Sequence, residues 1–110
     1  MKTTQQIFGK AALALALAAT CGAVHAQAQP KVKVGLMLPS TGTYASPGTA
    51  IGNGFKLFVT EQGGKLGGRE VEYFSVDDES DPSKATENAN KLIKRDKVDV
   101  LVGTVHSGVA

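Results

Sequence analysis

The 110-residue sequence contains no tryptophan, one cysteine and only 5% aromatic residues. A single cysteine cannot form an internal disulfide, so the chain is not one of the small disulfide-stabilised proteins. The sequence also lacks an apolar run of the roughly 20 residues that a membrane-spanning helix needs. Its longest such run, Ala11 to Val24, is too short.

The amino-terminal stretch has the pattern of a secretory signal. Lys2 and Lys10 are the only charges before Lys31, and they precede the short apolar run. In Val24-His25-Ala26, small residues follow at the third and first positions before the expected cleavage site. We therefore expect residues 1–26 to be a signal peptide.

Cleavage is expected after Ala26, with Ala28 as a second register. An uncleaved amino-terminal anchor and a lipoprotein anchored at Cys21 are the alternatives. Thr20 fits poorly beside a lipidated cysteine, and an anchor would need a longer apolar run.

The charge balance changes once this signal is set aside. The whole chain has 12 basic and 10 acidic residues, and two of the lysines lie in the signal. The remainder is therefore close to neutral. The basic charge reflects export, and no nucleic-acid partner is expected.

The first half of the remaining chain predicts a strand, a loop and a helix. An apolar run predicts a buried strand at 32–38, and the turn-rich segment from Pro39 to Gly48 predicts a loop. Ser46-Pro47 suggests a hydroxyl cap followed by proline at the first helical position. Gly63-Gly64 is expected to end the helix. The residues at helical spacing are Ile51, Phe55, Phe58, Val59 and Gln62.

The second half predicts a strand, a helix and another strand. β-Branched and aromatic residues indicate a strand at about 70–77. Asp81-Pro82 is expected to cap and begin a helix, and Val98 to Val102 to form the last strand. The residues expected on one helix face are Ala85, Ala89, Leu92, Ile93 and Asp96.

The order β-α-β-α-β predicts an α/β fold with a doubly wound, mostly parallel sheet and strand order 2-1-3. In that order the helices cover opposite faces, which creates a topological switch point. Ligands bind there, beyond the carboxyl ends of the strands. The two loops facing the switch point are 39–48 and 103–108.

Several kinds of chemistry lack their motifs. The glycines have neither dinucleotide-binding nor phosphate-loop spacing, and no cofactor is expected. The acidic run Asp77 to Asp81 could hold a divalent ion, but a solvated loop in which Asp81 caps a helix explains it more simply. Adjacent His106 and Ser107 do not form a catalytic pair, since such groups are assembled from distant positions.

The two loops supply candidate ligand-binding residues. The Ser107 hydroxyl could donate to a ligand carboxylate while the following N–H groups offer an anion site. An ordinary helix cap is the alternative. Tyr44, with Thr41 or Thr43, could place an apolar wall or a phenol beside a ligand, or simply pack the turn.

Three segments together resemble a known family. They are "VKVGLMLPSTGTYASPG", "GGREVEYFSVDDESDPSKATENANKLI" and "VDVLVG". They resemble the amino-terminal part of solute-binding proteins of ABC importers, above all the leucine/isoleucine/valine-binding type with the type I periplasmic binding fold. The resemblance covers about 32–110.

The resemblance implies two α/β lobes that close on a small carboxylate ligand, such as a branched-chain or related amino acid. It implies a periplasmic, monomeric protein that serves an ABC permease and is not an enzyme. Because relatives are much longer, 27–110 is expected to be an incomplete amino-terminal lobe. The ligand-binding residues implied are Ser107, His106, Gly108, Tyr44, Thr43 and Ser40.

The sequence departs from the family pattern at one place. Pro47 precedes Gly48, where amino-acid binders can carry an aromatic residue, and the stretch from Val105 to Ala110 is also similar to binders of aromatic or other organic acids. Those acids are therefore an alternative ligand class. A ligand-sensing receptor domain is another alternative, and an exported α/β enzyme with His106 as its base is a third.

Overall fold

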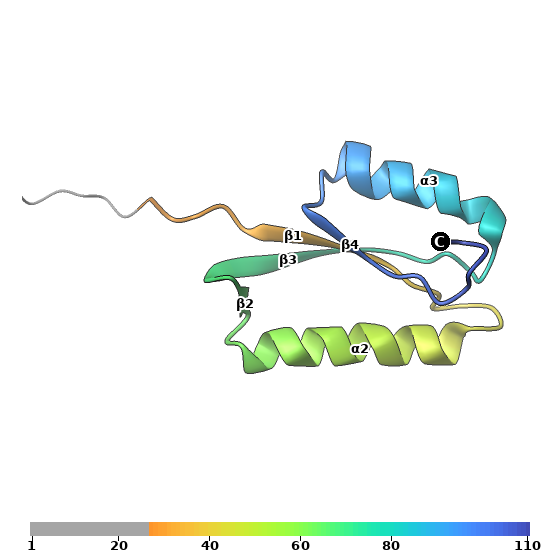
Figure 1. Ribbon diagram of the computed structural model, residues 1–110, viewed down its shortest axis with the longest axis horizontal. Helices are drawn as coiled ribbons and strands as arrows, with labels where there is room; N and C mark the ends of the chain where they lie inside the picture. Colours follow the sequence, from red (N-terminus) through yellow and green to blue (C-terminus); the bar gives the residue numbers. More distant parts are fainter. Residues whose placement is uncertain (1–26) are drawn as a thin grey trace, which may run out of the picture.

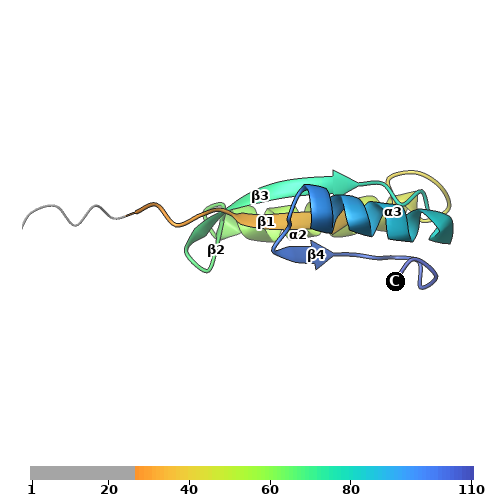
Figure 2. The same ribbon diagram turned by 90° about the horizontal axis from the view of Figure 1, so that it is seen from above.

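The computed structural model describes residues 27–110, so the predicted signal peptide lies outside the described residues. These residues form a four-stranded sheet in the order β2-β3-β1-β4 (Figures 1 and 2). The strands are β1 Val32–Met37, β2 Lys65–Leu66, β3 Arg69–Val76 and β4 Val100–Val102. β1 pairs in parallel with both β3 and β4, which confirms the predicted strand order.

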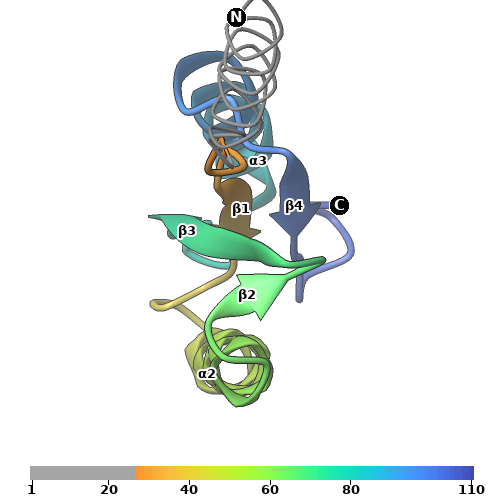
Figure 3. The same ribbon diagram turned by 90° about the vertical axis from the view of Figure 1, so that its left-hand side faces the viewer.

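Helices cover both faces of this sheet. The helix α2, Ala45–Glu61, lies on one face. A continuous helical segment covers the other face (Figures 1 and 3). It comprises a 3₁₀ turn at Pro82–Lys84, α3 at Ala85–Asn90 and a π-helical turn at Lys91–Arg95. The predicted switch point between β1 and β4 is therefore confirmed.

The side chains of β1 divide the core into two layers, because successive residues of a strand point to opposite faces. Val34, Leu36 and Leu38 are buried on the α2 side. Met37 packs with Leu92 on the α3 side. Residues near the carboxyl end of β1 are thus held from both faces, which fixes the starting point of the loop that follows.

The start of α2 differs from the prediction. Its first helical residue is Ala45, and Tyr44 precedes it without a side-chain capping hydrogen bond. The assignment of Ser46 as cap and Pro47 as first helical residue is therefore wrong. Pro47 is tolerated at the third position, because N–H groups in the first turn have no acceptor within the helix.

The buried face of α2 is also narrower than the predicted stripe. Val59 is 2% exposed, but Ile51 is 45% and Phe58 51% exposed. Gly48 is buried, and a Cβ atom there would collide with the carbonyl oxygen of Pro39. Gly48 therefore lets the first turn of the helix approach the residue pair that follows β1, while Phe55 and Val59 supply the apolar contacts farther along the helix.

The other helical segment needs one similar correction. Leu92 is fully buried as expected, whereas its neighbour Ile93 is 56% exposed. The Asp81 cap is confirmed, since its side chain accepts a hydrogen bond of 2.8 Å from the Ser83 N–H. Gly63 and Gly64, with φ of 72° and 75°, end α2 as predicted.

Strand limits shift at both later strands. β3 occupies 69–76 instead of 70–77, and β4 begins at Val100 instead of Val98. The Val98 N–H donates to the carbonyl of Leu92, which holds this residue to the preceding helix. Pairing with β1 begins only when the Asp99 N–H donates to the carbonyl of Lys33.

The short strand β2 was not predicted, because two residues carry no periodicity. It forms an antiparallel hairpin with β3 through a turn at Gly67 and Gly68, both with positive φ. This turn lies at the amino end of β3. No helix within residues 27–110 is long and apolar enough to cross a membrane.

Candidate ligand-binding site

The loops that follow β1 and β4 meet at the carboxyl end of the sheet. Tyr44, at the end of the first loop, contacts His106 in the second, with ring centroids 5.3 Å apart and an interplanar angle of 68°. Such edge-to-face packing is favourable for aromatic rings. The predicted convergence of the two loops is therefore present, and these two rings form its contact.

The second loop, 103–108, is organised around His106. The Gly108 N–H donates to His106 Nδ1 at 2.9 Å. The His106 carbonyl oxygen accepts from the Thr104 hydroxyl at 3.1 Å and from the Val109 N–H at 2.9 Å. Val109 is 3% exposed and packs into the core on the α3 side. The loop is thus closed by local hydrogen bonds and anchored by one apolar side chain.

Ser107 projects from the outer part of this loop and is exposed. Within residues 27–110 its hydroxyl has no hydrogen-bond partner, which leaves it able to donate to a ligand. The Gly108 N–H, in contrast, is already used by His106. The Val109 N–H is likewise used by the His106 carbonyl, so both backbone donors expected to face an anion after Ser107 are engaged inside the loop.

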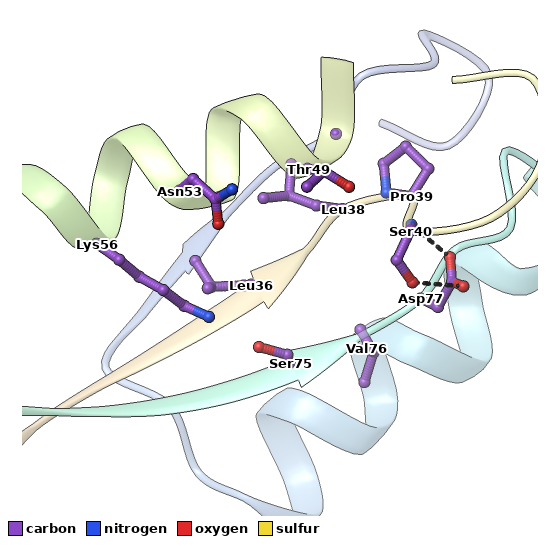
Figure 4. Close-up of a pocket in the computed structure, with 12 residues that line it drawn as sticks. Leu36, Leu38, Pro39, Ser40, Thr49, Asn53, Lys56, Ser75, Val76 and Asp77 are labelled. Carbon is purple, nitrogen blue, oxygen red and sulfur yellow. Dashed lines mark hydrogen bonds between the residues drawn. The ribbon is translucent and has the colours of Figure 1, made fainter. Parts of the chain in front are cut away.

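Asp77, immediately after β3, holds the first loop. Its Oδ1 accepts from the Ser40 N–H at 2.9 Å and the Glu79 N–H at 2.8 Å. Its Oδ2 accepts from the Ser40 hydroxyl at 2.7 Å and the Thr41 hydroxyl at 2.8 Å. Figure 4 shows the two bonds between Ser40 and this carboxylate. The predicted ligand residue Ser40 is therefore also a structural contact between loops.

These bonds set the titration of Asp77. Desolvation by burial, the largest single influence, raises the pKa of this carboxyl. The hydrogen bonds from the Ser40 hydroxyl and N–H, the Glu79 N–H and the Thr41 hydroxyl together outweigh it and hold the pKa well below its usual range. Asp77 is therefore ionised at neutral pH and remains an acceptor for Ser40 and Thr41 of the first loop and for the Glu79 N–H.

Ser80 makes a second connection to the first loop. Its hydroxyl oxygen accepts from the Tyr44 N–H at 3.0 Å, and the hydroxyl donates to the Thr41 carbonyl at 3.2 Å. Thr43, another predicted ligand residue, is exposed between these anchors. The sequence reasoning missed Asp77 and Ser80 as anchors. The available signal was an acidic residue directly after a strand that neighbours β1.

A cavity lies beside this loop and is not lined by either of the two aromatic rings. It has a volume of about 430 Å³ and opens between α2 and the sheet (Figure 4). Of the predicted ligand residues, Ser40 alone borders it. Its polar lining comprises Ser40, Thr49, Asn53, Lys56, Ser75 and Asp77. Tyr44 and Ser107 are exposed and His106 is half-buried.

Three carboxylates of the acidic run are Asp77, Asp78 and Asp81, and each accepts hydrogen bonds within the protein. Within the described part of the chain, no three His, Cys, Asp or Glu side chains are grouped so that they could hold a metal ion. Asp78 is fully buried and its Oδ1 accepts from the Ser80 N–H at 2.9 Å. Together with the Asp81 cap, these contacts give the carboxylates structural roles.

Comparison with known proteins agrees with this architecture. Residues 31–110 match the family described as periplasmic binding protein. The Leu/Ile/Val-binding protein BraC3 of Rhizobium johnstonii is 36% identical over 86 residues, which are 76% of this chain and 23% of that protein. The chain spans about a quarter of the length of the curated relatives it matches.

Two solved structures have the same fold over most of the described residues. An ABC-transporter solute-binding protein from R. palustris, in complex with benzoate, is 60% identical with a TM-score of 0.71, covering 73% of this chain and 22% of that chain. The branched-chain amino acid transporter protein LivJ from Streptococcus pneumoniae, in complex with isoleucine, is 29% identical with a TM-score of 0.67, covering 73% of this chain and 24% of that one.

The resemblance noted in the sequence is therefore confirmed at the level of family and fold. The family match extends from just before β1 to the last residue of the chain. It includes both loops at the switch point. The chain belongs to the periplasmic binding protein family, whose solved relatives include solute-binding proteins of ABC transporters.

Proposed function

We propose that this chain forms part of an exported solute-binding protein that captures a small carboxylate and delivers it to an ABC permease. The observation that carries the proposal is the meeting of the β1 and β4 loops at the switch point through Tyr44 and His106. Open α/β sheets bind ligands at such points. Family membership supports the transport role.

The chemistry of the two loops suits a carboxylate. The Ser107 hydroxyl is exposed and able to donate to a carboxylate oxygen. The paired rings of Tyr44 and His106 offer a partly apolar wall for the rest of the ligand. Thr43, Ser40 and Gly108 complete the proposed ligand residues, with Ser40 and Gly108 acting mainly through the shape of their loops.

An aromatic carboxylate is the first ligand class we propose. It is supported by the 60% identity with the R. palustris protein that was solved with benzoate. A wall of two aromatic rings also matches an aromatic ligand. Pro47, which stands where amino-acid binders can carry an aromatic residue, points in the same direction.

A branched-chain amino acid is the second candidate. It is supported by the similarity to the Leu/Ile/Val-binding protein BraC3 and to the isoleucine complex of LivJ. Both candidates share a carboxylate, so both use the proposed Ser107 contact. The part of the ligand away from the carboxylate distinguishes them.

Thermal unfolding of the ligand-free, complete gene product tests both candidates. Benzoate, 4-hydroxybenzoate, leucine, isoleucine and valine would be added separately. A true ligand at 100 times its dissociation constant stabilises the folded protein by about 2.7 kcal/mol. Ser107→Ala should reduce this effect without changing the stability of the ligand-free protein. If no acid in this panel stabilises the protein, the proposed ligand class is wrong.

Export has its own test. The mass of the mature protein from the periplasmic fraction should correspond to cleavage after Ala26 or Ala28. Retention of the first 26 residues would contradict the proposed signal peptide.

Gel filtration of the same sample checks the expectation that the protein is a monomer.

A further inference from the structure

The hydrogen bond inside the 103–108 loop defines which nitrogen of His106 carries a proton. Gly108 N–H can only donate, and it donates to His106 Nδ1 over 2.9 Å. A neutral imidazole has one protonated nitrogen and one acceptor nitrogen. Because Nδ1 is the acceptor, the proton of the neutral ring is on Nε2.

We propose that His106 is the positioning residue of this loop, and that its Nδ1 contact with Gly108 turns Nε2–H into the ring donor offered to the bound carboxylate. This carboxylate role rests on the proposed function. The fixed tautomer and the loop contact do not, because they follow from the geometry of the ligand-free chain.

Three observations support the positioning role. His106 holds the carboxyl end of the loop by two bonds, with its ring accepting from the Gly108 N–H and its carbonyl accepting from the Val109 N–H. A Cβ atom at Gly108 would lie 2.9 Å from the His106 ring and from Pro82, so the loop is tightly seated against the start of the helical segment that precedes β4. Tyr44 contacts the same ring from the other loop. The ring therefore has a defined position as well as a defined tautomer.

The other ring nitrogen is suited to a ligand. Within residues 27–110, His106 Nε2 has no hydrogen-bond partner, and the side chain is only partly buried. The next residue in the sequence is Ser107, which is exposed. Two neutral donors on one loop, an O–H and an N–H, match the two oxygens of a carboxylate.

Nitrogen NMR of the ligand-free chain tests the tautomer directly. The sample is the mature complete gene product, ¹⁵N-labelled at histidine, and comparison with the His106→Asn variant identifies the signals of His106. We expect an acceptor-type Nδ1 and a protonated Nε2 at about pH 9, where an ordinary imidazole is neutral. A protonated Nδ1, or an equal mixture of the two forms, would overturn the proposal.

A pair of variants tests the positioning role. An asparagine side chain can accept from the N–H two residues ahead, as Asp77, Asp78 and Asp81 already do in this chain. His106→Asn should therefore preserve the hydrogen-exchange protection of the Gly108 amide. His106→Gln is one carbon too long for this turn and should lose roughly two- to tenfold of that protection. Equal loss in both variants would overturn the positioning role.

Benzoate binding by the complete gene product tests the donor role. His106→Asn keeps the loop but lacks the Nε2–H, so it should bind benzoate roughly ten- to a hundredfold more weakly than the wild type. Unchanged affinity in this variant would overturn the donor role. If the wild type binds neither benzoate nor any other acid while the tautomer and exchange results hold, the proposed function and the donor role fail and the positioning role stands.

Discussion

The Asp77 carboxylate accepts the Ser40 hydroxyl at 2.7 Å and thereby ties the carboxyl ends of β3 and β1 together. The two strands pair in parallel up to Met37 and Val76. This contact continues the connection past the last ladder residues. The first loop therefore leaves the sheet from a fixed point.

Replacing Asp77 by asparagine separates the contributions of the two carboxylate oxygens. In Asp77→Asn, the amide oxygen can still accept from the Ser40 and Glu79 N–H groups. The amide nitrogen cannot accept from the Ser40 and Thr41 hydroxyls. We expect a loss of about 1–2 kcal/mol in the free energy of unfolding, measured with urea. Asp81→Asn is the control, because asparagine caps helices as well as aspartate does and should leave stability nearly unchanged.

The lowered pKa of Asp77 predicts that the effect of this substitution on stability depends on pH. The pKa of Asp77 is lower in the folded state than in the unfolded chain, so its contribution is complete above the ordinary aspartate pKa of 3.8. It decreases as the pH falls through that value toward the folded-state pKa. The difference in unfolding free energy between wild type and Asp77→Asn should therefore be constant from pH 7 to about pH 5 and shrink below about pH 4. A constant difference down to pH 2 would contradict this assignment.

Two glycines of α2 predict opposite effects of the same substitution. Gly48→Ala would place a Cβ against the Pro39 carbonyl oxygen and should cost about 1–3 kcal/mol of unfolding free energy. Gly54→Ala meets no atom within 4 Å and should stabilise the helix by about 0.5–1 kcal/mol. Parallel urea titrations of the two variants measure both values. Equal effects would show that α2 does not approach the sheet through Gly48.

Two adjacent apolar residues provide another matched pair. Leu92→Ala removes a fully buried side chain from the α3-side core and should cost about 2–5 kcal/mol. Ile93→Ala changes a residue that is 56% exposed and should alter stability by no more than about 0.5 kcal/mol. Thermal unfolding followed by circular dichroism compares them. A larger effect at Ile93 would reverse the corrected orientation of this helical segment.

The sheet order was predictable because the apolar pattern, the crossover lengths and the handedness rule leave few arrangements. The start of α2 was not. Ser46-Pro47 has the composition of a helix start, but the closure of the first loop onto Ser80 and Asp77 begins the helix at Ala45. The first residue of α2 therefore depends on tertiary contacts of the loop that precedes it.

The candidate site was predictable to a similar extent. The position of both loops at the switch point follows from topology, and the meeting of Tyr44 with His106 agrees with it. The roles of Asp77, Ser80 and the His106 Nδ1 contact required coordinates. Each depends on hydrogen-bond geometry that spacing along the chain does not encode.

The Gly67-Gly68 turn has a practical consequence. It lies at the amino end of β3, whereas both candidate ligand loops lie beyond the carboxyl ends of the strands (Figure 1). No atom lies within 4 Å of the Cβ positions of these glycines. A fluorescent reporter inserted between them would sit at the far end of the sheet from Tyr44 and His106. The hairpin is therefore the place to attach a sensor dye or tether the protein to a surface.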